Sequence, residues 1–323
     1  MKGIGKKFIA AGVLCLLSAL AQAGTLTVQS PTANAFLGQT NTLRFIITGA
    51  KLEVTVKAEI TGPTGTTTIE RKFTPDGDGE ISNSLALNFS ETTSEGDYSI
   101  KVSATEPANT YEPTTIPVKV DVKAPKVLEF YPANGQHKRG LVKIRARLLE
   151  PNLKSWEILV NDQPIANNTG STTDVSVDWN TAGIARDGNQ SISLKVTDEA
   201  GNETSRSVNI TLDRVQPTVT IVYPQAGNRI SPQTTIPVIV DIADASTSSV
   251  DVTGVEVVLR RMDGSYLGSV ARVSVTNQGS TTLRWTGRIR SSVPLPSRFK
   301  VVVDCIDKAG NRATRQEVSV TIG

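Results

Sequence analysis

The sequence predicts an all-β protein in which three tandem β-sandwiches follow an N-terminal export signal. The first observation is a repeat: residues 125–135, PKVLEFYPANG, closely resemble residues 217–227, PTVTIVYPQAG. The second is a shared pentapeptide near the end of each repeat, DEAGN at 198–202 and DKAGN at 307–311. The third is period-two alternation of apolar and polar residues, which is typical of half-buried strands. Together they predict a string of similar β-modules and not one large enzyme core.

The first 23 residues have the three parts of a secretory signal peptide. Lys2, Lys6 and Lys7 form a positive start, residues 8–20 are apolar, and Ala21-Gln-Ala23 is a cleavage site of the A-x-A kind. The apolar run is short for a membrane-spanning helix, and no second such run follows. We therefore expect residues 1–23 to be removed, and the mature chain to be secreted without a transmembrane anchor.

The charge balance of the mature chain argues against a nucleic-acid partner. The full sequence has 34 Lys and Arg against 31 Asp and Glu, and three of the lysines but none of the acids lie in residues 1–23. The remainder is thus neutral, without a basic block or stripe. A nucleic-acid-binding protein is expected to be basic, so we expect no nucleic-acid partner.

Clean alternation marks the expected strands from one end of the mature chain to the other. Turn-forming residues recur between these strands, and the spacing is typical of β-sandwiches. The clearest segments are 54–60 (VTVKAEI), 142–148 (VKIRARL), 192–196 (ISLKV) and 318–322 (VSVTI).

The repeat sets the module boundaries. The same interval separates Asp121 from Asp213 and Tyr131 from Tyr223. Each aspartate is expected to end the last strand of one module, and a proline four residues later to open the next, since proline suits a strand start. The predicted modules are therefore 24–122, 123–214 and 215–323, of which the first is the most divergent.

Residues 179–202 and their counterparts in the last repeat resemble bacterial immunoglobulin-like (Ig-like) domains of secreted and cell-surface proteins. The resemblance rests on Trp179-Asn-Thr, on Leu194-Lys-Val-Thr-Asp-Glu-Ala-Gly-Asn202, and on the Asp-x-x-x-Pro linker that follows. It covers the second and third modules well and the first weakly. It implies three tandem Ig-like Greek-key sandwiches with a binding or spacer role.

Two interpretations of the acidic motifs remain open. Asp198 and Asp307 begin turns in which Gly201 and Gly310 can adopt a positive φ and the carboxylates can accept backbone hydrogen bonds. Alternatively, the resemblance implies Ca²⁺ at module junctions, shared between such turn acids and linker aspartates. The matching linker residues are Asp121 and Asp213, and oxygen ligands of this kind suit Ca²⁺.

The aromatic residues favour packing over a sugar-binding platform. Trp179 and Trp285 stand in matching places of two modules, which predicts a repeated packing role. Tyr131 and Tyr223 are expected to pack between modules.

Nothing in the sequence indicates an enzyme. The single histidine, His137, lies in a polar stretch that predicts a surface loop, and no nucleophile elbow or metal-protease motif accompanies it. After export Cys305 is the one cysteine left, and alternation places it on the apolar face of a strand.

The function expected is binding, adhesion or spacing at the cell envelope, with an envelope protein or a polysaccharide as partner. The alternative is a structural or accessory subunit of a surface-layer or export-linked assembly. The chain is expected outside the cell or on its surface, with the periplasm as the alternative; the sequence assigns no oligomeric state. Residues 243–254 and 291–297 of the third module are the expected specificity loops, since loops on a rigid scaffold are free to vary.

Overall fold

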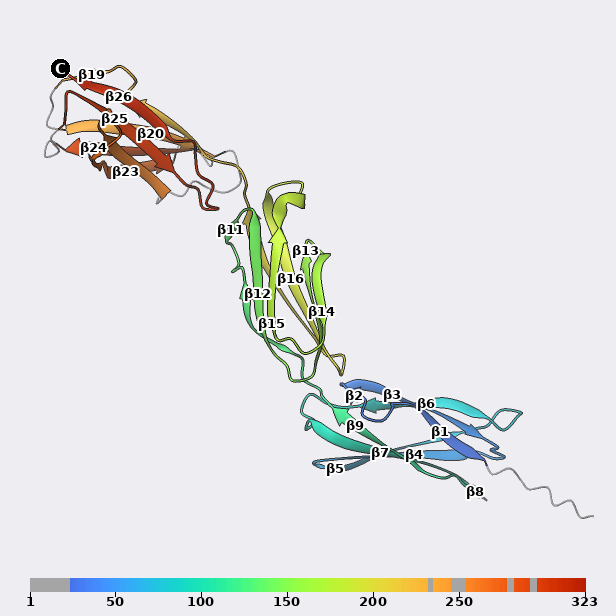
Figure 1. Cartoon of the computed structure of the whole chain (residues 1–323). Helices are drawn as coiled ribbons and strands as arrows, with labels where there is room; N and C mark the ends of the chain where they lie inside the picture. Colours follow the sequence, from blue (N-terminus) through green and yellow to red (C-terminus); the bar gives the residue numbers. More distant parts are fainter. Residues whose placement is uncertain (1–23, 108, 232–234, 245–253, 278–281, 291–294) are drawn as a thin grey trace, which may run out of the picture. The chain divides into compact units, whose positions relative to one another are not determined.

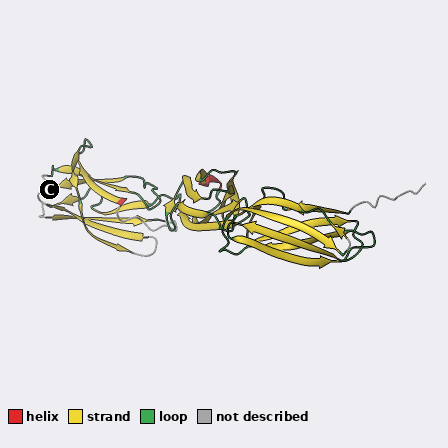
Figure 2. Ribbon diagram, turned by 90° about the horizontal axis from the view of Figure 1, so that it is seen from below, coloured by secondary structure: helices red, strands yellow, loops and turns green. Residues whose placement is uncertain are grey.

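The protein is described by a computed structural model that covers residues 24–107, 109–231, 235–244, 254–277, 282–290 and 295–323. It divides into two compact units, one up to Lys123 and one from Ala124, and each is treated by itself. Nearly all regular structure in the described residues is strand (Figure 2), and Figure 1 labels the strands of which the sandwiches are built. Residues 1–23, the predicted signal peptide, lie outside the described residues, and so do most of the two expected specificity loops.

The N-terminal unit is one sandwich of two sheets. One sheet has the order β1-β3-β6 and the other β2-β9-β7-β4-β5, with β8 paired to the far end of β7. The strands are β1 (Thr25–Ser30), β2 (Phe36–Leu37), β3 (Thr40–Thr48), β4 (Val54–Gly62), β5 (Gly65–Phe73), β6 (Ile81–Asn88), β7 (Gly96–Glu106), β8 (Asn109–Thr110) and β9 (Thr114–Val120).

The second unit begins with a sandwich of the same plan. Its sheets have the orders β10-β12-β15 and β11-β17-β16-β13-β14. The elements are β10 (Lys126–Tyr131), β11 (His137–Lys138), β12 (Leu141–Leu149), β13 (Leu153–Val160), β14 (Gln163–Thr169), β15 (Asp174–Asn180), the 3₁₀ turn η1 (Thr181–Gly183), β16 (Gly188–Asp198) and β17 (Glu203–Leu212).

The third sandwich adds one strand to this plan. Its sheets have the orders β18-β20-β24-β23 and β19-β26-β25-β21-β22. The strands are β18 (Thr218–Tyr223), β19 (Arg229–Ile230), β20 (Thr235–Ala243), β21 (Val255–Arg260), β22 (Tyr266–Ser269), β23 (Ala271–Asn277), β24 (Thr282–Arg290), β25 (Arg298–Cys305) and β26 (Gln316–Ile322).

All three sandwiches split their first strand between the two sheets. A first segment pairs antiparallel with the second long strand, as β10 does with β12. A short second segment then crosses over and pairs parallel with the last strand, as β2 does with β9, β11 with β17 and β19 with β26. This shared topology confirms the predicted tandem of Ig-like sandwiches. The boundaries 24–122, 123–214 and 215–323 stay predictions, and three separate apolar cores fall within them.

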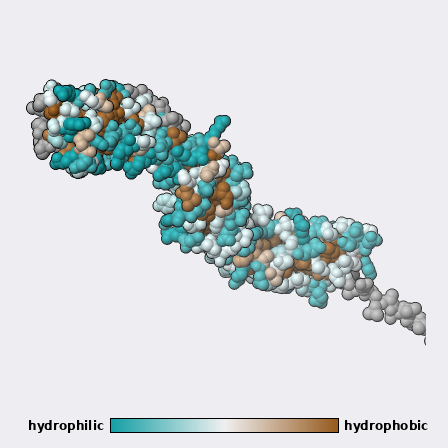
Figure 3. All heavy atoms as spheres, turned by 45° about the horizontal axis from the view of Figure 1, so that its top comes forward, coloured by the Kyte–Doolittle hydropathy of each residue, from teal (hydrophilic) through white to brown (hydrophobic). Residues whose placement is uncertain are grey.

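Each core forms because alternate side chains of facing strands point between the sheets. On β12 the even-numbered residues are buried and the odd-numbered ones exposed, as the alternation predicted. Cys305 is fully buried on β25, also as predicted. The polar side chains therefore remain on the outer faces, and the surface seen in Figure 3 is largely hydrophilic with small apolar patches.

The packing role predicted for the two tryptophans is confirmed, whereas the expectation for the tyrosines is wrong. Trp179 and Trp285 are both buried, but Trp179 pairs with Val142 near the start of β12 whereas Trp285 pairs with Val240 near the end of β20. The two tryptophans therefore lie at different positions along the length of their sandwiches. The tyrosines were expected between modules, but Tyr223 packs against the core of its own sandwich. The side chain of Tyr131 is half exposed on the outer face of β10.

An ion pair across β20 and β24 should make the third sandwich sensitive to acid. Arg284 donates from Nε and Nη2 to the two oxygens of Asp241 at 2.7 and 2.6 Å, and this hydrogen bonding lowers the pKa of Asp241 below its usual 3.8. A lowered carboxyl pKa contributes stability that is present above the ordinary value and is lost as the pH falls through the lowered one. We expect Asp241→Asn to reduce the free energy of unfolding by about 1 kcal/mol at pH 7. The difference in unfolding free energy between wild type and variant, measured by urea titration, should shrink below pH 3.8. A difference that does not depend on pH would contradict this account.

Candidate functional site

The two Asp-x-Ala-Gly-Asn segments form the tight turns that the sequence predicted. One joins β16 to β17 and the other joins β25 to β26, and their glycines, Gly201 and Gly310, have φ values of +85° and +88°. In each turn the aspartate accepts from the asparagine four residues later, through both the backbone N–H and the side-chain amide. The distances are 2.8 and 2.8 Å onto Asp198, and 2.8 and 2.7 Å onto Asp307. The turn interpretation is confirmed at both places.

The two linker aspartates also occupy equivalent positions. Each follows the last strand of its sandwich, and its backbone N–H donates to the short second segment of the first strand. Asp121 donates to Leu37 O at 3.0 Å and Asp213 to Lys138 O at 2.9 Å. Each carboxylate in turn accepts the backbone N–H two residues later, from Lys123 at 3.4 Å and from Val215 at 3.0 Å. The start of the linker is thereby fixed against the sandwich that it leaves.

In the second unit, three carboxylates meet where the linker enters the third sandwich. Asp213, Asp244 and Asp307 each place a carboxylate oxygen within 4.8 Å of the other two, and their side chains are buried, with 0, 1 and 3% exposure. Asn311 closes the group: its buried amide donates to Asp213 O at 3.0 Å as well as to Asp307 Oδ2. The linker acid, the end of β20 and the β25–β26 turn thus converge on one point, which we call the junction cluster.

The donor set of the junction cluster suits a hard divalent cation. Ca²⁺ binds carboxylate and carbonyl oxygens at 2.3–2.6 Å, so oxygens on opposite sides of one ion lie about 4.6 to 5.2 Å apart. The spacing of the three carboxylates is within that limit. Like charges buried this close repel one another strongly unless a proton or a cation compensates them. The residues present therefore fit Ca²⁺.

Asp244 was missed by the sequence prediction, which identified Asp213 and Asp307. It lies directly after β20, at a place with no turn motif to mark it. The signal that could have revealed it is the repeat itself, because Glu150 directly follows β12, the equivalent strand of the second sandwich. Glu150 is also buried. Asp121 and Asp198 remain predicted Ca²⁺ ligands on the basis of that repeat.

His137 lies in a short strand and not in the surface loop that the sequence predicted. It begins β11, pairs with Thr211 of β17 and is partly buried. The pairing with the last strand explains the error, since a two-residue strand leaves no periodicity to read. Its Nδ1 is buried without a hydrogen-bond partner among the described residues.

The sequence pattern of the bacterial Ig-like domain matches residues 148–238 and 235–322, which is more than half of the chain. The chain therefore belongs to the bacterial Ig-like domain family. No curated protein matches it.

Solved structures with similar folds share little sequence with the chain. A titin fragment, I67–I69, has 10% identity and a TM-score of 0.39, with 93% of this chain and 97% of that chain covered. The fibronectin(III)-like modules of Clostridium thermocellum CbhA have 13% identity and a TM-score of 0.39, with 61% and 93% covered. A Ca²⁺-stabilised adhesin with which an Antarctic bacterium binds ice has 18% identity and a TM-score of 0.33, with 94% and 75% covered.

Among the described residues, no helix has the length and apolar character needed to cross a bilayer.

Proposed function

We propose that this chain is a non-catalytic Ig-like repeat protein that acts outside the cytoplasm in binding, adhesion or spacing at the cell envelope. Its family and its tandem of three sandwiches support this role. The observation that carries it is the junction cluster, in which buried groups from the linker and from the third sandwich meet. A protein that only needed independent domains would not require buried polar contacts at the linker.

The junction cluster is proposed to hold one Ca²⁺. Asp213, Asp244 and Asp307 would supply the carboxylate ligands. The Asn311 amide would hold the carboxylate of Asp307 and the backbone carbonyl of Asp213 in place. The ion would supply positive charge that offsets the repulsion among the three acids. Because the ligands come from the linker and from two separate strand ends of the third sandwich, binding would also hold the linker in one conformation. By the repeat, the same role is proposed for Asp121 and Asp198.

Protease treatment of intact cells is the experiment that tests the surface role. We expect added protease to cleave this chain on intact cells, detected by blotting, because a secreted surface protein is accessible from outside. A periplasmic marker protein, which should stay intact until lysis, is the control. Protection of this chain until lysis would contradict surface exposure and favour the periplasmic alternative, an accessory subunit of an envelope assembly.

A further inference from the structure

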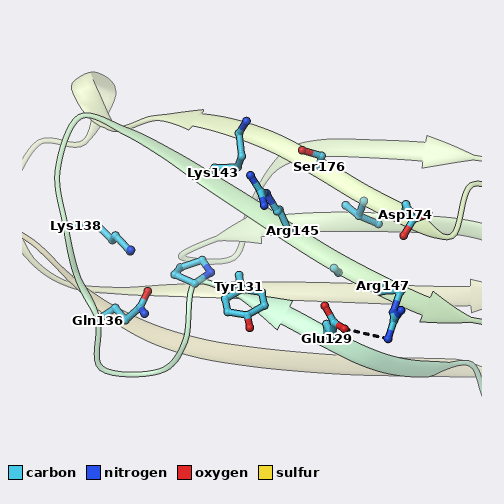
Figure 4. A pocket seen from close by; sticks show the side chains of 12 residues that line it. Glu129, Tyr131, Gln136, Lys138, Lys143, Arg145, Arg147, Asp174 and Ser176 are labelled. Atoms are coloured by element: carbon cyan, nitrogen blue, oxygen red, sulfur yellow. Dashed lines mark ion pairs between the residues drawn. The ribbon is translucent and has the colours of Figure 1, made fainter.

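The second sandwich carries a hollow on the outer face of its β10-β12-β15 sheet. The hollow measures about 600 Å³ and is lined by outward-pointing residues of all three strands and by the segment that leads into β11. Figure 4 shows Tyr131 and Glu129 from β10 on one side of β12, and Ser176 and Asp174 from β15 on the other. Its lining includes four cations and two carboxylates, so the hollow is positive in balance.

Strand pairing arranges the outward residues in rows that cross the sheet. In one row Arg147 lies between Glu129 and Asp174, and its Nη2 is 2.9 Å from Glu129 Oε1. In another, Lys143 pairs with Asp178 at 3.8 Å. Each of these cations is therefore matched by an acid on a neighbouring strand, as is common on the exposed face of a sheet.

The row between these two is different. Arg145 lies between Tyr131 on β10 and Ser176 on β15, and all three side chains are exposed. Among the described residues no carboxylate lies within ion-pair distance of Arg145, and none of the hydrogen bonds found involves its guanidinium. The row thus presents an aromatic ring, a cation and a hydroxyl side by side, and we call it the Tyr-Arg-Ser row.

These three groups match the chemistry of an acidic sugar. An exposed tyrosine ring offers an apolar face on which a sugar ring can stack, with a polar tip at its edge. The guanidinium has a planar fork that binds a carboxylate through two parallel hydrogen bonds. Directly paired residues of neighbouring strands have Cβ atoms about 5 Å apart, a distance comparable to the width of one sugar ring.

We propose that this hollow binds a polysaccharide that contains uronic acids, with one sugar residue on the Tyr-Arg-Ser row. The ring lies over Tyr131, its carboxylate pairs with Arg145, and a hydroxyl hydrogen-bonds with Ser176. The remaining cations of the hollow extend the positive field along the chain of sugars. This inference rests on the proposed envelope-binding function and names the class of ligand.

The third sandwich does not repeat the arrangement. Tyr223 corresponds to Tyr131, but the residue paired with it on β20 is Ile239, where the second sandwich has Arg145. Tyr223 is also packed against its own core. In the first sandwich the equivalent row is Ser30, Arg44 and Ser84, which keeps the arginine and a serine but has no aromatic ring. Among the described residues, the full Tyr-Arg-Ser row therefore occurs in the second sandwich.

The test is calorimetric titration of the intact chain with an oligogalacturonate, with a neutral cello-oligosaccharide and with dextran sulfate as comparison ligands. We expect the chain to bind oligogalacturonate and not the neutral ligand. Arg145→Gln and Tyr131→Ala should each weaken binding about tenfold or more. Tyr131→Phe, which keeps the ring, should bind nearly as well as the wild type.

Lys154→Gln is the matched control, because Lys154 is an exposed cation on β13, in the other sheet of the same sandwich, and takes part in no ion pair of the described residues. We expect it to change affinity less than twofold. Three results would show general attraction of anions and overturn the proposal. They are an equal loss of affinity in Lys154→Gln, an unchanged affinity in Tyr131→Ala, and binding of dextran sulfate as tight as that of oligogalacturonate. An absence of oligogalacturonate binding would also overturn the proposal. If protease still cleaves the chain on intact cells in that case, the proposed surface role stands and only this ligand class is excluded.

Discussion

Adding Ca²⁺ should raise the melting temperature of this protein, and Asp244→Asn should remove that gain. A ligand that binds the folded state alone stabilises it by about 2.7 kcal/mol at a hundred times its dissociation constant. For a unit of this size that corresponds to a shift of about 5 to 10 °C. Differential scanning calorimetry with Ca²⁺ and with a chelator measures it.

The same variant should behave in the opposite way without metal. Asp244→Asn removes one of three carboxylates that lie within 4.8 Å of one another, so it relieves repulsion in the metal-free protein. We therefore expect the variant to melt above the wild type in chelator and below it in Ca²⁺. Asp263→Asn, at an exposed hairpin of the same sandwich, should keep the full response to Ca²⁺. A melting temperature that changes with neither Ca²⁺ nor chelator would exclude a bound Ca²⁺ ion.

Asn311→Ala should destabilise the second unit by about 1 to 3 kcal/mol. The change removes the amide that donates to Asp213 O and Asp307 Oδ2, and leaves both acceptors buried with one donor fewer. The loss should appear as a lower midpoint in urea unfolding. Thr314→Ala, an exposed position just beyond the turn, is the control and should stay within about 0.5 kcal/mol of the wild type. Equal effects of the two changes would refute the role assigned to the Asn311 amide.

The architecture was predictable because the alternation within strands and the repeat between modules both indicate β-sandwiches. Alternation fixed which side chains of β4, β12 and β16 point inward, and the repeated Asp-x-Ala-Gly-Asn turn marked the ends of two sandwiches. Two of the three proposed carboxylate ligands followed from the same repeat, since Asp213 and Asp307 lie in recognisable motifs.

What could not be predicted depends on the pairing of strands distant in sequence. Trp179 and Trp285 look equivalent along the chain, yet the register of β15 on β12 differs from that of β24 on β20. Asp244 becomes a neighbour of Asp213 and Asp307 only when strand ends from different sheets meet. The Tyr-Arg-Ser row likewise joins residues that lie 14 and 31 positions apart in the chain, and no local pattern shows that they share a face.

The divided first strand bears on how each sandwich responds to a pulling force. In every sandwich the short second segment runs parallel to the last strand, as β11 does beside β17 and β19 beside β26. Two parallel strands pulled apart from opposite ends must slide past each other, so their hydrogen bonds are loaded together and in shear. A hairpin pulled open at its ends would lose its bonds one at a time. The terminal strands of each sandwich are thus arranged to resist tension along the chain.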